Sequence, residues 1–109
     1  MIPDSGLRIR GQLERESVMN RLAGKFALME ALKAEGVKYI FGNPGTSESP
    51  IMDALQSYPE IRYILVTQEG TAMGMADAYA RATGIPSFVN LHIETGLANG
   101  ISLLHNANS

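Results

Sequence analysis

Residues 61–70 read IRYILVTQEG, an apolar run that leads directly into an acidic side chain and a glycine. Residues 61–66 have the composition of a buried strand, and Glu69 falls where the next helix would begin. Burying a carboxylate at the end of an apolar strand costs free energy unless a partner hydrogen-bonds or protonates it. Glu69 is therefore a candidate site residue, although an acid stabilised by the dipole of a helix N-terminus would give the same pattern.

Two other predicted strands, residues 37–41 and 85–91, also end in polar, glycine-containing loops. The first leads into the turn GNPGT at residues 42–46, where glycine allows close backbone approach beside a helix start. The turn lacks a P-loop lysine and the GxGxxG spacing, so an ordinary tight turn explains it equally well. His92 follows the second strand and is a candidate general acid or base, with a structural histidine as the alternative.

Apolar residues recur at helical spacing between these strands. The pattern predicts helices over residues 17–34, from a cap at Ser49 and Pro50 to the exit at Pro59, over 69–82 and over 96–106, with Gly36 ending the first. Strands that alternate with helices predict an α/β fold, an open parallel sheet with helices on both faces that binds ligands at the carboxyl ends of its strands. Because three strands make a small sheet, we expect a truncated domain.

Composition narrows the classes of function. The 109 residues carry a net charge of −2 without basic runs, which argues against a nucleic-acid binder. The chain has no cysteine, no apolar stretch of the roughly 20 residues that span a bilayer, and no secretory signal, so we expect a cytoplasmic protein with no membrane partner. Residues 1–16 mix charged side chains with glycine and predict a flexible N-terminal extension.

Four motifs in order resemble the thiamine diphosphate-dependent decarboxylases and carboligases, in their N-terminal pyrimidine-binding domain. They are GVKYIFGNPGT at 36–46, QEG at 68–70, ADAYAR at 76–81, and NLH at 90–92 followed by GLANG at 96–100. The resemblance runs from about residue 21 to the end. It implies the thiamine diphosphate-binding fold for residues 17–109, as a partial domain truncated after the third strand and fourth helix.

The resemblance also implies roles for individual residues. Glu69 matches the glutamate that hydrogen-bonds the cofactor aminopyrimidine and promotes its activation. Asn43, Pro44 and Gly45 match the cofactor-binding turn, and together with the NLH motif they are most similar to the benzoylformate decarboxylase branch. There, His92 matches an active-site acid/base, and Thr46 matches a serine that binds the substrate carboxylate.

Two departures from the family are visible. Ala78 stands where the family commonly has glycine, which adds a methyl group to a helix packing contact. Glu94 and Thr95 follow His92 where small or apolar residues are typical of the branch, so the identity of the 2-keto acid substrate stays open.

The resemblance implies parts that the chain lacks. In the family, the diphosphate and Mg2+ are held by a C-terminal domain with a Gly-Asp-Gly stretch, and the full site forms between subunits of a homodimer or homotetramer. Neither that stretch nor an acidic metal cluster occurs here, so we expect no metal ligand in this chain and no catalysis by the isolated chain. The alternatives are an acetolactate synthase-like carboligase, a non-catalytic binding or regulatory module, and an unrelated flavodoxin-like nucleotide-binding domain.

Overall fold

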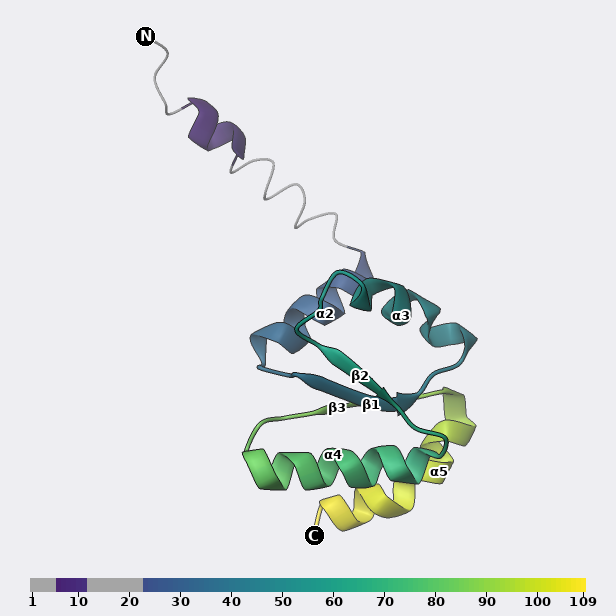
Figure 1. Cartoon of the computed structure of the whole chain (residues 1–109). Coiled ribbons are helices and arrows are strands. Elements are labelled where there is room, and N and C mark those ends of the chain that lie inside the picture. Colours follow the sequence, from purple (N-terminus) through teal and green to yellow (C-terminus); the bar gives the residue numbers. More distant parts are fainter. Residues whose placement is uncertain (1–5, 12–22) are drawn as a thin grey trace.

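The computed structural model describes residues 6–11 and 23–109 of the chain. Residues 6–11 are helical. The elements that follow are α2 (Gly24–Ala34), β1 (Tyr39–Asn43), the 3-10 turn η1 (Thr46–Glu48), α3 (Ser49–Leu55), β2 (Arg62–Leu65), α4 (Glu69–Thr83), β3 (Phe88–Leu91) and α5 (Ile93–Ala107) (Figure 1). Most of the predicted extension over residues 1–16, and the predicted helix start at residue 17, lie outside the described residues.

The three strands form one parallel sheet in the order β2-β1-β3, with β1 in the centre. Phe41 of β1 pairs with Ile64 of β2 on one side and with Val89 of β3 on the other. Helices α2 and α3 lie on one face of the sheet, and α4 and α5 lie on the other (Figure 1). The predicted open parallel sheet with helices on both faces is therefore confirmed.

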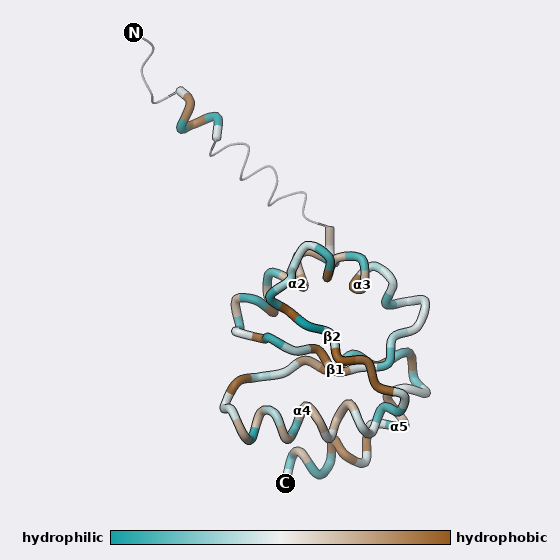
Figure 2. The backbone as a smooth tube through the Cα atoms, in the orientation of Figure 1, coloured by the Kyte–Doolittle hydropathy of each residue, from teal (hydrophilic) through white to brown (hydrophobic). Residues whose placement is uncertain are grey.

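Successive side chains of the central strand point into two apolar clusters, one on each face, as the two-residue period of a strand requires. Ile40 is fully buried in the cluster beneath α2 and α3, whereas Phe41 packs in the cluster beneath α4. Figure 2 shows hydrophobic residues concentrated along the strands. The added methyl group of Ala78 lies at an exposed position on α4, so it does not disturb this packing.

Strand β1 begins at Tyr39, two residues later than predicted, because a helix cap engages Val37. Gly36 takes a left-handed φ of +78° after α2, which confirms the predicted glycine cap. The N–H of Val37 donates to the carbonyl of Leu32 at 3.0 Å, as in a Schellman motif, and is therefore unavailable to the sheet.

Three other predicted boundaries also differ from those in the structure. Strand β3 is shorter than predicted, because Pro86 has no N–H to donate to a ladder. Helix α5 begins at Ile93, three residues early, so His92 is its N-cap residue. The predicted cap at Ser49 is wrong, because η1 precedes α3 and the Ser49 hydroxyl donates to the Thr46 carbonyl at 2.7 Å.

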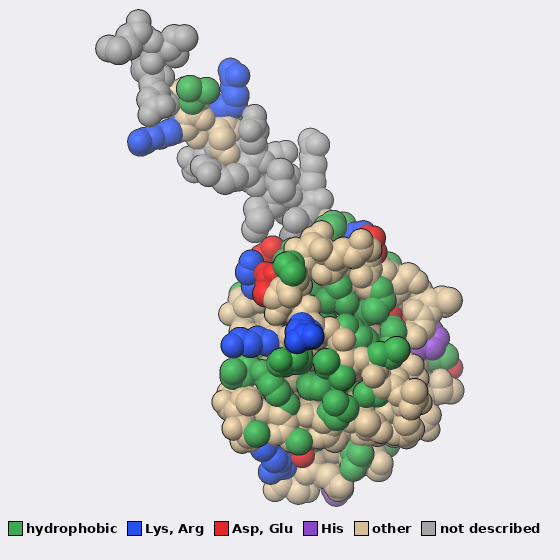
Figure 3. Space-filling model, viewed as in Figure 1, with side chains coloured by type: hydrophobic (Ala, Val, Ile, Leu, Met, Phe, Trp, Pro, Cys, Tyr) green, Lys and Arg blue, Asp and Glu red, His purple; other side chains and the backbone are tan. Residues whose placement is uncertain are grey.

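Strand β2 forms one edge of the sheet and is only partly covered. Leu65 is 68% exposed, and hydrophobic side chains gather over this strand on the face shown in Figure 3. An exposed apolar edge strand is a surface on which further polypeptide can pack. Across residues 6–11 and 23–109, every helix is too short or too polar to cross a membrane.

Candidate active site at the carboxyl edge of the sheet

The order of the strands makes the carboxyl end of the central strand, β1, a topological switch point. From β1 the chain passes to α3 on one face, whereas from β3 it passes to α5 on the other face (Figure 1). The connections therefore diverge between the carboxyl ends of β1 and β3, which is where open α/β sheets bind ligands. Asn43 ends β1, His92 follows β3, and Glu69 begins α4 after β2.

Glu69 is half-buried and receives two long hydrogen bonds from amide side chains. Asn43 Nδ2 donates to Oε1 at 3.3 Å, and Asn99 Nδ2 of α5 donates to Oε2 at 3.4 Å. Gln68 caps α4 by accepting from the Thr71 N–H at 3.0 Å, so Glu69 is also the acid of a helix N-terminus. The structure thus brings Asn43 and Glu69 together, as expected for one site.

The glycines of α5 explain how that helix reaches Glu69. Gly96 and Gly100 are both buried and lie one turn apart. A Cβ atom on Gly100 would lie 3.1 Å from Met73 Cγ, and one on Gly96 would lie 3.7 Å from Glu69 Cγ. The motif at residues 96–100 therefore lets α5 pack closely on the start of α4.

His92 pairs with a second carboxylate, that of Glu48 in η1. His92 Nδ1 lies 2.8 Å from Glu48 Oε2, and the same oxygen accepts the Gly45 N–H at 2.7 Å. Glu48 is only 8% exposed. A Cβ atom on Gly45 would lie 2.3–2.4 Å from three atoms of the His92 ring, so this position requires glycine for a close approach and not for an unusual φ.

Hydrogen-bond donors keep the carboxyl group of Glu48 ionised. Burial alone would raise the pKa of this carboxyl, but the hydrogen bonds from the Gly45 N–H and from His92 outweigh it, so that the pKa lies below its ordinary value. Burial, with a smaller contribution from the Glu48 charge, raises the pKa of Tyr63 to about 12. Tyr63 is therefore a neutral phenol at neutral pH.

A further hydrogen bond joins the two outer strands across β1. The Tyr63 hydroxyl donates to Oδ1 of the buried Asn90 at 2.9 Å. A Cβ atom on Gly42 would lie 2.4 Å from that hydroxyl and 2.3 Å from the Asn90 carbonyl oxygen. Because Gly42 has no side chain, Tyr63 of β2 can reach Asn90 of β3 across the central strand.

The remaining predicted residues connect these two carboxylates. Pro44 is half-buried and joins Asn43, which contacts Glu69, to Gly45, which contacts the His92–Glu48 pair. Thr46 is exposed at the rim as the first residue of η1. In residues 6–11 and 23–109 there is no group of three or more His, Cys, Asp or Glu side chains that could hold a metal ion.

Sequence reasoning missed Glu48 and Asn99. An acid three residues after a glycine at a helix entry is the spacing at which a side chain reaches back to the backbone, and this pattern at Gly45 and Glu48 is a usable signal. Asn99 lies three residues after Gly96 on the same face of α5, but nothing in the sequence says which side chain that face meets.

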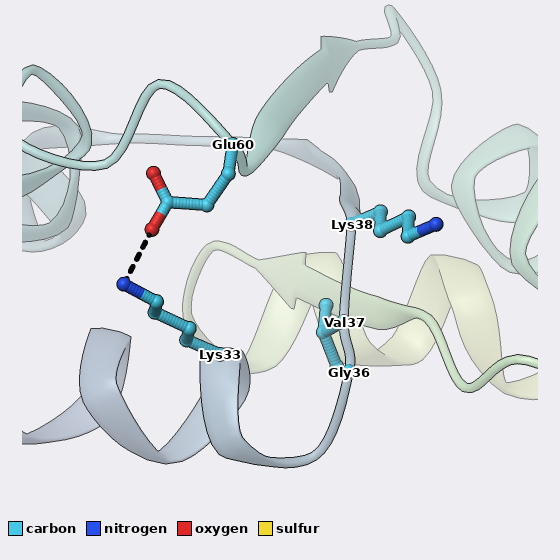
Figure 4. Close-up of a pocket in the computed structure, with 5 residues that line it drawn as sticks. All are labelled: Lys33, Gly36, Val37, Lys38 and Glu60. Carbon is cyan, nitrogen blue, oxygen red and sulfur yellow. Dashed lines mark ion pairs between the residues drawn. The ribbon is translucent and has the colours of Figure 1, made fainter.

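A surface hollow also lies away from this edge of the sheet. It has a volume of about 210 Å3, lies before the amino end of β1 and is lined by Lys33, Gly36, Val37, Lys38 and Glu60 (Figure 4). Lys33 Nζ lies 3.0 Å from Glu60 Oε1, whereas Lys38 points away from that pair (Figure 4). This hollow is at the opposite end of the strand from Glu69 and His92.

Comparisons with known proteins agree with this arrangement. Residues 22–109 match the model of the thiamine pyrophosphate enzyme, N-terminal TPP binding domain. The chain belongs to the thiamine pyrophosphate enzymes. It is 48% identical over 82 residues to benzoylformate decarboxylase of Pseudomonas aeruginosa, which covers 74% of this chain and 15% of that enzyme.

Other relatives in this family include an acetolactate synthase subunit and a decarboxylase with a solved structure. The acetolactate synthase large subunit of Haemophilus influenzae is 39% identical over 84 residues, which covers 77% of this chain and 15% of that subunit. The thiamine diphosphate-dependent 4-hydroxybenzoylformate decarboxylase of Rhodococcus jostii RHA1 superposes with a TM-score of 0.69 at 36% identity, over 75% of this chain and 15% of that one. The chain thus spans about 15% of the length of these relatives.

Proposed function

We propose that this chain supplies the aminopyrimidine side of the active site in a thiamine diphosphate-dependent 2-keto acid decarboxylase similar to benzoylformate decarboxylase. One observation carries the proposal: the half-buried carboxylate of Glu69 and the imidazole of His92 lie at the same sheet edge. Glu69 is hydrogen-bonded to Asn43, and His92 is hydrogen-bonded to Glu48. A histidine can gain and lose a proton near neutral pH, which a decarboxylase needs at the keto oxygen.

The side chains at this edge fit an aminopyrimidine. That ring has nitrogen atoms that accept hydrogen bonds and an amino group that donates them, and the edge offers the carboxylate of Glu69 and the amide of Asn43 as partners. The contacts to Glu69 at 3.3 and 3.4 Å exceed the usual N–H···O range, so a ligand can replace one of them at small cost. In this proposal the turn formed by Asn43, Pro44 and Gly45 lines the cofactor ring.

Each remaining residue has a separate task. Glu69 holds the hydrogen bond to the ring that activates the cofactor, and Thr46 offers a hydroxyl at the rim to the substrate carboxylate. His92 transfers a proton to the oxygen derived from the keto group. When bound, thiamine diphosphate supplies the nucleophilic carbon and accepts the electron pair that carbon dioxide leaves behind.

Other parts of the site are proposed to come from outside this chain. The diphosphate and Mg2+ would be held by a domain with a Gly-Asp-Gly stretch, in a homodimer or homotetramer whose subunits complete each other's sites. The proposed cellular location is the cytoplasm, and we expect the isolated 109-residue chain to be inactive.

An acetolactate synthase-like carboligase is the second candidate, favoured by the 39% identity to the Haemophilus influenzae subunit. His92 argues against it, since this histidine belongs to the motif that is most similar to the decarboxylase branch. A non-catalytic binding module is the third candidate, in which Glu69 is only the acid of a helix N-terminus.

Chimaeras can separate the three candidates. The aligned segment of this chain would replace the matching segment of Pseudomonas aeruginosa benzoylformate decarboxylase and, separately, of the Haemophilus influenzae acetolactate synthase subunit. We expect the first chimaera to release carbon dioxide and benzaldehyde from benzoylformate when thiamine diphosphate and Mg2+ are added, and the second to form little acetolactate from pyruvate. Each parent enzyme is the control.

The opposite results have distinct meanings. Acetolactate from the second chimaera, with no decarboxylation by the first, would replace the decarboxylase with the carboligase. A folded first chimaera whose activity is insensitive to Glu69→Gln would favour the non-catalytic module. Folded, cofactor-loaded chimaeras that are both inactive would contradict the enzyme assignment.

A further inference from the structure

The His92–Glu48 pair has an asymmetry that the proposed function does not use. Both hydrogen bonds to Glu48, from the Gly45 N–H at 2.7 Å and from His92 Nδ1 at 2.8 Å, end on the same carboxylate oxygen. Glu48 is buried, whereas the side chain of His92 is 31% exposed. The imidazole therefore has one nitrogen committed to the protein interior while part of the ring remains accessible.

An ionised carboxylate can only accept hydrogen bonds, so the atom facing it must donate. The pKa of Glu48 lies below its ordinary value, so this side chain is charged at neutral pH and remains an acceptor. Nδ1 of His92 must then carry a proton. In neutral imidazole the second nitrogen, Nε2, has no proton and holds the lone pair.

The ring has little freedom to leave this arrangement. A Cβ atom on Gly45 would overlap the His92 ring at 2.3 Å, which shows that the ring lies against the backbone of the turn. The residue after His92, Ile93, takes a φ of +49° at the start of α5. A β-branched residue in the left-handed region is a rare and strained conformation, and it persists only where its surroundings enforce it.

We propose that Glu48 is the positioning residue of His92, holding the neutral imidazole in its Nδ1–H form so that Nε2 is the nitrogen that exchanges protons with the substrate. Glu48 itself touches no reacting atom in this scheme. The catalytic consequence rests on the proposed function, because it requires His92 to be the acid/base. The tautomer is a property of the chain itself.

The tautomer can be measured directly by nitrogen NMR of the full 109-residue chain labelled with 15N-histidine. The spectra are recorded at a pH above which the imidazole shifts no longer change, so that the rings are neutral and the shifts distinguish the protonated nitrogen from the bare one. His105, the other histidine of the chain, is exposed and gives an internal reference, and His105→Gln assigns the signals. We expect a protonated Nδ1 and a bare Nε2 for His92.

Two substitutions test the cause. Glu48→Met keeps the length of the side chain but removes the carboxylate that accepts from Nδ1, so His92 should lose its exclusive Nδ1–H form. Glu94→Gln removes the same charge from an exposed position two residues after His92, and should leave the tautomer as in the unsubstituted chain. The unfolding midpoint of each variant shows whether it is folded.

Three results would overturn the proposal. They are an Nε2–H form of His92 in the unsubstituted chain, an unchanged tautomer in folded Glu48→Met, or an equal change in Glu94→Gln. The first result is measured on the unsubstituted chain, so the proposal can be tested even if a variant does not fold.

The kinetic consequence is tested separately in the decarboxylase chimaera. We expect Glu48→Met to lower kcat by about 10- to 100-fold with little change in KM, as when an orienting partner of a functional histidine is removed. An unchanged kcat in an active chimaera would contradict the positioning role. An inactive chimaera with a normal His92 tautomer in the chain would count against the proposed function and leave the assignment of Glu48 intact.

Discussion

Two carboxylates lie at the carboxyl edge of the same sheet, and their surroundings differ. Glu48 is buried and receives short hydrogen bonds of 2.7 and 2.8 Å from the backbone of its own turn and from a ring on the neighbouring strand's end. Glu69 is half-buried, and its two amide donors are at 3.3 and 3.4 Å. The first carboxylate is engaged by the fold, whereas the second has contacts that a ligand can replace.

This difference separates residues that hold a site from residues that act in it. A short bond to a buried charge contributes to stability and fixes geometry, since removing either partner leaves a desolvated group unpaired. A long bond to a half-exposed charge contributes little and can be exchanged for a ligand bond. We therefore expect substitutions at Glu69 to change activity more than stability, and substitutions around Glu48 to change both.

The largest effect should come from Glu69→Gln in the decarboxylase chimaera. The amide can still fit the space but cannot share a proton with the cofactor ring, so we expect kcat to fall by at least about 100-fold. The free energy of unfolding should stay within about 0.5 kcal/mol, as for other substitutions outside the core. Steady-state kinetics and urea unfolding measure the two quantities.

Glu94→Gln is the matched control, because it removes an exposed acid from the first turn of α5 as Glu69→Gln removes one from the first turn of α4. The fall in kcat can be converted to a free energy and compared with the loss of unfolding free energy. If the two are equal for Glu69→Gln, then Glu69 is a structural acid and the contrast with Glu48 is wrong.

The next effect concerns the close contact that holds the Glu48 cluster. In Gly45→Ala the new methyl group would lie 2.3 Å from His92 Nδ1, so the ring or the turn must move, and we expect the contact between His92 and Glu48 to weaken. Overpacking of this kind costs about 1–3 kcal/mol of unfolding free energy. Denaturant unfolding of the 109-residue chain measures the cost.

Gly24→Ala is the corresponding control, because a Cβ atom there would have no neighbour within 4 Å among residues 6–11 and 23–109. Its first-turn position in α2 predicts no loss, or a gain of up to about 1 kcal/mol from a less flexible unfolded chain. Equal stabilities of the two variants would show that the turn accommodates the methyl group and that the ring of His92 is not held against it.

The same comparison shows what the sequence could predict. The strands, the helices and the edge at which Glu69 and His92 lie follow from apolar periodicity and from glycine-containing turns, because these are local signals. The partners of the two residues do not: Glu48 reaches His92 across 44 positions, and Asn99 reaches Glu69 across 30. Contacts of that kind depend on strand order, which the sequence pattern leaves open.

The boundaries that were wrong have equally physical causes. A pattern of apolar residues does not show that the Val37 N–H is already bonded to a helix cap, or that Pro86 shortens β3. Nor does it show the early start of α5 at Ile93, which places a β-branched residue at a φ of +49°. Each case is a hydrogen-bonding or backbone constraint that overrides propensity.

A smaller effect is the pH dependence of the Glu48 cluster. Because the pKa of Glu48 in the folded chain lies below the ordinary value of 4.5, its ionised form is favoured by folding. This contribution is fully present above the unfolded pKa and is lost as the pH falls through the folded pKa. The difference in unfolding free energy between the unsubstituted chain and Glu48→Gln should therefore shrink as the pH is lowered below 4.5.

Urea unfolding at several pH values measures that difference. Other carboxylates, including Glu60, titrate in the same range, but they are present in both proteins and cancel. A difference that is constant from neutral to acid pH would mean that Glu48 is not stabilised as an anion, and that its two short contacts do not distinguish it from Glu69.

The smallest effect tests whether the backbone after His92 is strained. A left-handed β-branched residue costs about 1–2 kcal/mol, and glycine removes that cost while adding about 1 kcal/mol for its place in a helix. Ile93 is 48% exposed, so little burial is lost, and Ile93→Gly should leave the stability unchanged or raise it by up to about 1 kcal/mol.

The control is Ile101→Gly, at a 56% exposed position of the same helix, which should instead lower the stability by about 1 kcal/mol. Thermal unfolding of both variants gives the comparison. Equal losses would mean that the conformation of Ile93 is relaxed, and the position of His92 would then depend on Glu48 and Gly45 alone.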